Sequence, residues 1–296
     1  MKLCLTGANS SVGRNLLQHL RQQEGCSAVA LVRSAEALAA LPQAENIDAR
    51  AVDYADHAAL VDAMRGTQAV VHLAGILFEG KHTRYQSANV ESTAAVVRAA
   101  QQARVPHIIF ISVLGADPSS RNPFHRSKGE AEKLVLESGL AATVLRTPLL
   151  LGPACAGGKA LLREARSGTA KLLGGGRHEV RPLDVDDLSE GILAACRHPK
   201  GARVLTLCGP TRVPYHTLVT QVAAQEGRAV QIASAPLWLV KTLSGINHAI
   251  KGYGFSPAIV DVITASEDVE DNADVALCLT LTPLQRTLAK LTEAKH

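Results

Sequence analysis

The chain has 296 residues, of which 47% are hydrophobic and only 3% are aromatic. This composition excludes a disordered chain and predicts a large core of Ala, Val, Leu and Ile, as in parallel sheets covered by helices. The formal net charge of +4 comes from scattered basic residues without a block of like charge, which argues against nucleic acid as a partner.

The six cysteines show neither a CxxC spacing nor a Cys/His metal spacing, so we expect no metal centre. The apolar start of the chain breaks at Gly7, which does not fit a signal peptide. No apolar run reaches the roughly 20 residues that span a bilayer. These features predict a cytoplasmic protein in a reducing compartment.

Short apolar runs alternate with helical patterns through the first half of the chain. Strands are expected at residues 2–8, 27–33, 47–54, 68–76, 107–116 and 141–152, and helices at 12–23, 90–103 and 127–138. Such alternation predicts right-handed βαβ units and an α/β fold with a Rossmann-type, doubly wound parallel sheet.

After Gly152 the pattern changes to glycine-rich loops around a short helix. Further on, we expect a helix at 185–198, a strand at 202–210 and a helix at 214–227. We therefore predict a dinucleotide-binding Rossmann domain at residues 1–150. Residues 151–296 are expected to form a smaller substrate or partner lobe that is interleaved with the sheet.

The segment 234–255 holds the only tryptophan, Trp238. We interpret it as a buried packing helix. The alternative is an exposed apolar helix that meets a protein partner or a membrane surface.

The stretch "TGANSSVGR" at residues 6–14 follows the first strand and opens the first helix. Small residues at this place let backbone N–H groups approach a pyrophosphate at a helix N-terminus. Gly7 fits the tight turn, Gly13 fits close packing of the helix, and Ser10 stands where the full pattern has a second glycine. The candidate cofactor-binding residues of this stretch are Gly7, Ser10, Val12, Gly13 and Arg14.

The second strand ends in "LVRS" and not in the carboxylate that NAD-binding folds place there. Arg33, Ser34 and Arg14 suit a 2′-phosphate, because arginine binds phosphate in a bidentate manner. We therefore favour NADP(H) as the cofactor, with NAD(H) as the alternative. Asp53, after the third strand, is placed to meet an adenine amino group, and a loop cap is its alternative role.

Together these motifs resemble the atypical or extended short-chain dehydrogenases/reductases, of the NAD-dependent epimerase/dehydratase type. Within that family the chain is most similar to the branch of the NADPH-binding accessory subunit of respiratory complex I. The stretches that indicate this are "SVLGADP", "HRSK" and "TPLQRTLAKL". The resemblance covers nearly the whole chain, through "TGANSSVGR", "HLAGI", "NVESTAAVVRAA", "ISVLGA", "FHRSK", "LRTPLLLGP", "VRPLDVDDLSEGI" and "LTLTPLQRTLAKL".

The resemblance implies a role for several residues. Lys128 matches the lysine that binds the nicotinamide ribose and lowers the pKa of a catalytic tyrosine, but Phe124 stands at the tyrosine position. Ser112 matches the hydroxyl residue that holds the substrate oxygen, although Val113 follows it. The remaining matches are Ala74 and Gly75 in the loop that lines the adenosine, and Asn89, which supports the site.

Phenylalanine cannot supply the proton that a carbonyl oxygen must gain or lose. Among its neighbours, His125 is expected to face solvent, because one residue along a helix turns a side chain by about 100°. Ser127 is an unactivated hydroxyl and a poor acid. Lys128 itself is the remaining candidate for the acid.

Other polar residues have plainer interpretations. Asp184, Asp186 and Asp187 precede or open a helix and are expected to cap it. His72 is expected to be structural. In the glycine-rich loop of the second lobe, Arg177 and His178 could meet an anionic substrate.

Three functions remain as hypotheses. The first is an NADP(H)-holding protein with low or no classical dehydrogenase turnover, structural or regulatory. The second is an active NADP-dependent oxidoreductase or epimerase-like enzyme that uses Lys128 on a small carbonyl or sugar-nucleotide substrate. The third is a regulator that senses the ratio of NADPH to NADP.

Overall fold

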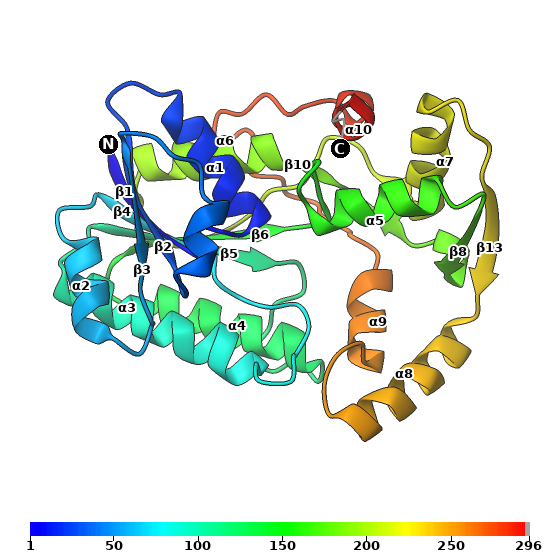
Figure 1. Ribbon diagram of the computed structural model, residues 1–296, viewed down its shortest axis with the longest axis horizontal. Coiled ribbons are helices and arrows are strands. Elements are labelled where there is room, and N and C mark those ends of the chain that lie inside the picture. Colours follow the sequence, from blue (N-terminus) through cyan, green and yellow to red (C-terminus); the bar gives the residue numbers. More distant parts are fainter. Residues whose placement is uncertain (294–296) are drawn as a thin grey trace.

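The computed structural model describes residues 1–293, and a seven-stranded parallel sheet forms its centre (Figure 1). Its strands lie in the order β11 (Ala202–Thr206), β6 (Ala141–Thr147), β5 (His107–Val113), β4 (Ala69–His72), β1 (Lys2–Thr6), β2 (Ser27–Val32) and β3 (Ile47–Ala51). This arrangement confirms the predicted Rossmann-type sheet. The strand order runs outward in both directions from the boundary between β1 and β4, which is where such sheets bind their ligands.

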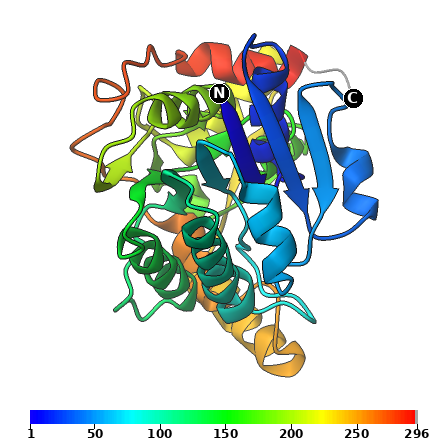
Figure 2. The ribbon, with the colours of Figure 1, turned by 90° about the vertical axis from the view of Figure 1, so that its left-hand side faces the viewer.

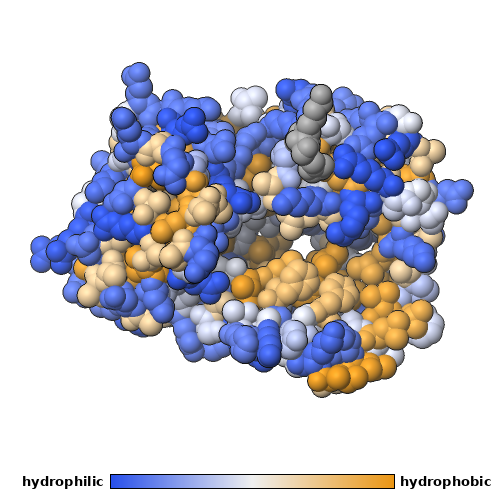
Figure 3. All heavy atoms as spheres, viewed as in Figure 1, coloured by the Kyte–Doolittle hydropathy of each residue, from blue (hydrophilic) through white to orange (hydrophobic). Residues whose placement is uncertain are grey.

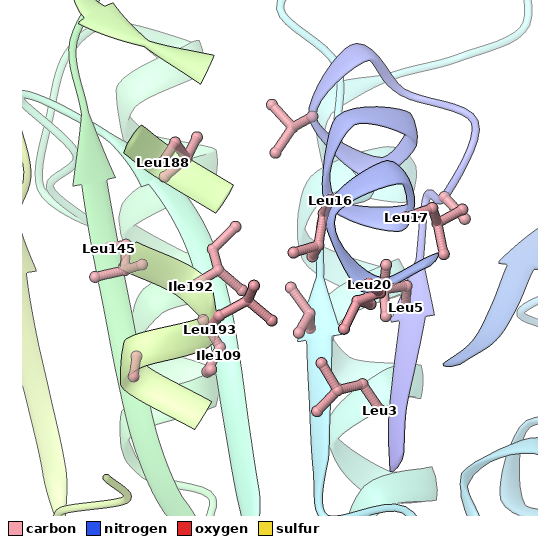
Figure 4. Close-up of a cluster of buried hydrophobic side chains, with 14 of the residues drawn as sticks. Leu3, Leu5, Leu16, Leu17, Leu20, Ile109, Leu145, Leu188, Ile192 and Leu193 are labelled. Atoms are coloured by element: carbon pink, nitrogen blue, oxygen red, sulfur yellow. The ribbon is translucent and has the colours of Figure 1, made fainter. Parts of the chain in front are cut away.

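Helices cover both faces of the sheet. On one face lie α1 (Ser11–Arg21) and α6 (Val185–Arg197), and on the other lie α2 (His57–Met64), α3 (Ser92–Gln102) and α4 (Pro123–Leu136) (Figure 1). Leucine and isoleucine side chains of α1 and α6 meet those of β1, β5 and β6 in a fully buried core (Figure 4). The core is therefore aliphatic, as the low aromatic content predicts.

A second lobe has its own apolar cluster, which includes Leu161, Leu218 and Leu288. It consists of α5 (Ala156–Ala165), α7 (Tyr215–Gln225), α10 (Leu284–Glu293) and the parallel pair β8 (Thr169–Leu173) and β13 (Gln231–Ala235). Between these elements the chain returns to the first domain, where β11 joins the central sheet and α6 packs on α1. Shorter elements are η1 (Glu36–Ala40), η3 (Gly174–Gly176) and the two-residue strand pairs β7 (Leu150–Leu151) with β10 (Leu183–Asp184) and β9 (Glu179–Val180) with β12 (Val213–Pro214).

Of the three aspartates predicted to cap a helix, Asp184 does so and also fastens the two lobes, whereas the carboxylates of Asp186 and Asp187 bind side chains or amides elsewhere. Asp184 is the N-cap of α6, where its carboxylate accepts a hydrogen bond from the Asp186 amide at 2.9 Å. The same carboxylate accepts hydrogen bonds from Lys290 at 2.8 Å and Thr287 at 2.9 Å, both on α10. The cap therefore connects the C-terminal helix to the Rossmann core.

The prediction that 234–255 is a buried packing helix is wrong. The segment forms α8 (Leu237–Lys251), which projects at one end of the molecule (Figure 2), and Ser244 is its one buried residue. Trp238 is 71% exposed and Ile250 is 79% exposed. The reason is that α8 packs mainly on the short helix α9 (Pro257–Thr264), which is too small to cover more than one side of it.

Several elements lie outside the sequence-based predictions. Helix α2 has eight residues and little amphipathic character, and α9, α10, β8 and β13 lie in the second half, where the alternating pattern is lost. Within residues 1–293, every helix is too short or too polar to cross a lipid bilayer.

Candidate dinucleotide-binding site

A cleft of about 640 Å³ opens beyond the carboxyl ends of β1, β2 and β4, at the point where the strand order reverses. Six of the predicted cofactor residues contribute to its lining, namely Gly7, Ser10, Arg33, Asp53, Ala74 and Gly75. Sequence reasoning missed other lining residues, among them Asn9, Tyr54, Ile76, Glu91 and Arg98. Its size and its place on the sheet suit a dinucleotide.

The glycines of the first turn stand at positions where the side chain of any other residue would clash with the backbone. Gly7 has a φ of +69°, and a Cβ there would lie 2.8 Å from the amide nitrogen of Ala74. A Cβ at Gly13 would lie 2.5 Å from the carbonyl oxygen of Ala8. Ser10 is the N-cap of α1, and its Oγ accepts a hydrogen bond from the Gly13 amide at 3.0 Å. The turn thus forms a cradle of small residues at a helix N-terminus, which fits a pyrophosphate.

The basic residues of the cleft differ in part from those predicted. Arg33, which directly follows β2, lines the cleft, but Arg14 and Ser34 do not. Arg98 lines it from α3, on the same helix face as Glu91. Positions 91 and 98 are seven apart and share a face, but the sequence does not reveal that this face turns toward the cleft.

Asp53 lines the cleft and also caps a loop. Its carboxylate accepts a hydrogen bond from the amide of Ala55 at 3.0 Å, and Tyr54 and Ala55 line the same wall. Burial raises the pKa of Tyr54 to about 12, so this phenol stays neutral. The structure thus shows the cap role of Asp53, and its contact with an adenine stays a prediction.

Lys128 lies on α4 next to the cleft but outside its lining, and a Cβ added at the lining residue Gly75 would lie 3.9 Å from its Nζ. The ammonium donates a hydrogen bond to the carbonyl oxygen of Ile111 at 2.8 Å and lies 4.1 Å from the centroid of the Phe110 ring. Burial lowers the pKa of Lys128 to about 7. The amine can therefore change its protonation state near neutral pH.

Phe124 lies one helical turn before Lys128, near the start of α4. Asn122 caps this helix by accepting a hydrogen bond from the Phe124 amide at 3.0 Å, and Pro123 occupies the first turn. The Phe124 ring is only 4% exposed and belongs to an apolar cluster with Tyr85 and Ile259. We call this group, with the partly buried Val113, Ile76, Phe255 and Val262 that pack on it, the Phe124 cluster.

Asn89 connects the loop after β4 to α4. It lies on a π-helical segment, η2 (Gln86–Glu91), and its Oδ1 accepts a hydrogen bond from the amide of Ile76 at 2.8 Å. Its Nδ2 donates to Ser127 Oγ at 3.0 Å, and Ser127 in turn donates to the Phe124 carbonyl at 2.8 Å. Single π-helical turns are frequent at functional sites, and this one aims a buried amide at the inner end of the cleft.

His125 does not face solvent as predicted. It is half-buried, its ring lies 5.7 Å from that of Phe124, and a Cβ on Gly115 would come within 3.2 Å of its Cε1. Burial lowers the pKa of His125. The loop after β5 folds over the helix start and covers the imidazole, which the helical angle alone does not reveal.

The two residues at the end of β5 lie in different surroundings. Ser112 is 1% exposed, and its Oγ has no hydrogen-bond partner within residues 1–293. The next residue, Val113, packs on the Phe124 cluster. Because side chains alternate along a strand, Ser112 shares the sheet face of Phe110, and an apolar side chain occupies the position beside Phe124.

His72 is structural, as predicted. Its Nδ1 lies 2.6 Å from Thr6 Oγ1 and its Nε2 lies 3.0 Å from Thr93 Oγ1, with the ring fully buried. Burial, and secondarily the nearby Lys128, lower the pKa of His72 to about 3. The imidazole is therefore neutral and fixed between two hydroxyls.

Arg177 and His178 belong to the second lobe and do not line the dinucleotide cleft. His178 stacks on the ring of Tyr215 at a centroid distance of 5.3 Å, and burial lowers its pKa. Their suggested contact with an anionic substrate stays a prediction.

Comparison with known proteins agrees with this geometry. The profile of the NAD(P)H-binding family matches residues 7–173, which is more than half of the chain. The chain therefore belongs to the NAD(P)H-binding family.

Individual relatives are more distant. The chain is 26% identical over 277 residues to the 4-hydroxy-2-methyl-3-oxo-4-farnesyl-3,4-dihydroquinoline-1-oxide ketoreductase of Stigmatella aurantiaca, covering 84% of this chain and 80% of that protein. It is 25% identical over 226 residues to the mitochondrial NADH dehydrogenase (ubiquinone) 1 alpha subcomplex subunit 9 of Arabidopsis thaliana, covering 72% of this chain and 54% of that protein. The second match bears out the similarity to the accessory subunit of complex I.

The fold is shared with solved structures of sugar-nucleotide enzymes. A structure described as MoeE5 in complex with UDP-glucose and NAD superimposes with a TM-score of 0.77 at 22% identity, covering 99% of this chain and 98% of that one. At this identity the likeness shows the fold alone.

Proposed function

We propose that this chain is an NADP(H)-binding protein that holds its dinucleotide with little or no tyrosine-dependent turnover. One observation carries the proposal: Phe124, which the family resemblance assigns to the position of the catalytic tyrosine, is 4% exposed and enclosed by an apolar cluster. A hydrocarbon ring cannot donate a proton to a substrate oxygen. General acid–base catalysis contributes about 10²–10⁴-fold, so its loss leaves a slow enzyme or none.

The hydroxyls close to Phe124 are poor replacements. Ser127 Oγ is engaged with Asn89 and with the Phe124 carbonyl. The Tyr85 hydroxyl donates to the carbonyl oxygen of Leu77 at 2.8 Å, and burial raises the pKa of Tyr85 to about 12. A phenol that gives up its proton so reluctantly is badly matched to catalysis near neutral pH.

We further propose that the preferred dinucleotide is NADP(H). Two guanidiniums, Arg33 and Arg98, line the cleft, and the residues that follow β2 contain no carboxylate at the position that NAD-binding folds use for the ribose hydroxyls. Glu91 also lines the cleft, about two helical turns before Arg98. This charge distribution supports a bound 2′-phosphate.

A second function is favoured by a different observation, the buried amine of Lys128 with a pKa of about 7. An ammonium with this pKa can act as the general acid of a reductase or epimerase-like enzyme. The Stigmatella relative is described as a ketoreductase and the MoeE5 structure contains UDP-glucose, so ketones and sugar nucleotides are the substrate classes to try first.

The experiment is a comparison of the native chain with Lys128→Ala. NADPH affinity is measured by nucleotide fluorescence, and NADPH oxidation is measured with a panel of ketones, quinones and sugar nucleotides. The proposed function predicts tight NADPH binding by the native chain with no acceptor-dependent oxidation. Oxidation by the native chain that disappears in Lys128→Ala would support the second function and reject the first.

A further inference from the structure

Helix α8 carries a stripe of large apolar side chains that face solvent. Leu239, Leu243, Ile246 and Ile250 follow a spacing of four, three and four residues, which places them on one helix face. They are 39%, 58%, 55% and 79% exposed, and Trp238 beside the first of them is 71% exposed. Contiguous exposed apolar surface of this kind marks an interaction site.

The stripe continues onto a second segment, the loop at residues 77–84. The amide of Gly254, just beyond α8, donates a hydrogen bond to the carbonyl of Glu79 at 2.9 Å, and the Phe255 ring lies 6.4 Å from that of Phe78. Leu77 and Phe78 are 37% and 43% exposed. We call the α8 stripe with Trp238, Leu77 and Phe78 the apolar tip; Figure 3 shows hydrophobic residues gathered around α8 at the lower right.

Basic side chains surround the apolar tip. Lys81, His82 and Arg84 are exposed on the loop, and Lys251 is exposed at the end of α8. Residues 234–256 contain no Asp or Glu.

The acidic groups nearby are engaged. Glu79 accepts a hydrogen bond from the Tyr85 amide at 2.9 Å, and Asp261 on α9 forms an ion pair with Lys241 at 2.6 Å. These two carboxylates keep their charge, but Lys81, Arg84, Lys241 and Lys251 outnumber them, so the surroundings of the apolar tip have a net positive charge.

We propose that the apolar tip docks on the surface of a lipid bilayer that contains anionic headgroups. An interfacial helix combines an apolar face that includes Trp or Leu with basic residues beside it, and α8 with its neighbouring loop has both. Each basic side chain near an anionic membrane surface adds about 1 kcal/mol of attraction. A second copy of this chain is a poorer occupant, because it would bring two positive surroundings together.

Docking would place the inner end of the dinucleotide cleft beside the membrane. Phe255 belongs to the Phe124 cluster and also contacts Phe78 of the apolar tip, and Ile76 belongs to that cluster and lines the cleft. The docking itself does not depend on whether the bound dinucleotide is turned over.

The test is co-sedimentation of the full chain with two kinds of vesicle. One kind is pure phosphatidylcholine, and in the other about 30% of the lipid is the anionic phosphatidylglycerol. The native chain is expected to bind the anionic vesicles, with a blue shift of the Trp238 emission, which reports on the tip because the chain has a single tryptophan. Leu243→Glu with Ile246→Glu is expected to lower the affinity at least tenfold. Lys81→Ser with Arg84→Ser is expected to lower it about fivefold for each charge, and added salt is expected to act in the same direction.

The matched control is Val275→Glu, because Val275 is apolar and 83% exposed but lies away from the apolar tip. It stands two residues after Ala273, whose amide donates a hydrogen bond to Thr206 at the end of β11. It should bind vesicles as the native chain does, and NADPH affinity verifies the fold of every variant. The proposal is overturned if the native chain does not bind anionic vesicles or if Leu243→Glu with Ile246→Glu binds them unchanged. A native dimer that this double variant dissociates, without vesicle binding, would identify a second copy as the occupant.

Discussion

Lys128 and Phe124 lie one helical turn apart on α4, and both are nearly buried. For the phenylalanine burial is favourable. For the ammonium it is costly, because the hydration that a buried charge loses outweighs its contacts with the Ile111 carbonyl and the Phe110 ring and the attraction of Glu132. An apolar residue at position 128 would make the fold more stable. A lysine at this position therefore fits a role in binding a ligand better than a role in stability.

This cost predicts how stability changes with pH. Burial lowers the pKa of Lys128 from 10.5 to about 7, so between these values the unfolded chain binds more protons than the folded chain. The free energy of unfolding of the apo protein should therefore rise with pH across that window. Lys128→Met should be the more stable protein at pH 7 and below, by on the order of a few kcal/mol, and the difference should shrink toward pH 10. Urea denaturation at several pH values measures it, and parallel curves for the two proteins would contradict it.

Arg33 and Arg14 make a matched pair for testing the cofactor preference, because only the first of the two lines the cleft. A lost charge-assisted contact costs about 1.5–3 kcal/mol, so Arg33→Ala should weaken NADPH binding about tenfold or more. NADH binding should change little. Calorimetric titration of both nucleotides gives the ratio, which Arg14→Ala should leave as in the native chain. An unchanged ratio in Arg33→Ala would reject the proposed preference for NADP(H).

Individual site residues were predictable from the sequence where the local backbone geometry requires one residue type. Gly7 and Gly13 were predictable because a turn and a close approach require them, and both have that geometry. Arg98 and Tyr54 were not predictable, because only the packing of α3 and of the loop after β3 decides that they line the cleft.

Among the helices, α6 and α10 depend on one another through Asp184. This carboxylate caps α6 and is 2% exposed while it binds Lys290 and Thr287. Removal of this carboxylate leaves α6 uncapped and the buried Thr287 hydroxyl without its acceptor, while Lys290 keeps its ion pair with Asp186 at 2.6 Å. The junction of the two lobes should thus be sensitive to this one side chain.

We expect Asp184→Ala to lower the free energy of unfolding by about 1–3 kcal/mol, since it removes a helix cap and the buried acceptor of Thr287 and Lys290. Asp268→Ala is the control, because Asp268 is 77% exposed in its ion pair with Arg212 and such pairs contribute about 0–1 kcal/mol. Denaturant unfolding followed by circular dichroism compares the two. Equal losses of stability would show that the 184–290 contact does not fasten the lobes.

Strands and helices were predictable to different degrees. The apolar strands of the first half alternate with periodic helices, and that pattern alone specifies the parallel sheet. Helix α8 was assigned correctly as a helix but wrongly as buried, because its sequence is apolar on more than one face. Burial depends on what packs against a helix, and α9 covers only one side.

In the molecule as a whole, the cleft at the β1/β4 boundary, the Phe124 cluster and the apolar tip follow one another along one side. The position of the cleft was predictable, since doubly wound sheets bind ligands where the strand order reverses. The connection from the cleft to the tip was not, because it depends on contacts between residues 77–84 and 252–255, which lie far apart in the sequence. These contacts join the proposed dinucleotide site to the apolar tip that we propose docks on the membrane.

The central claim is that the missing hydroxyl at Phe124 prevents turnover of a bound dinucleotide. The most direct measurement is the absorbance at 340 nm of NADPH bound at one equivalent to the native chain and to Phe124→Tyr, each mixed with the same panel of acceptors. We predict that NADPH persists on the native chain and that Phe124→Tyr, with equal NADPH affinity, oxidises it at least about 100-fold faster with an accepted substrate. Oxidation by the native chain at a rate similar to that of Phe124→Tyr would contradict the account.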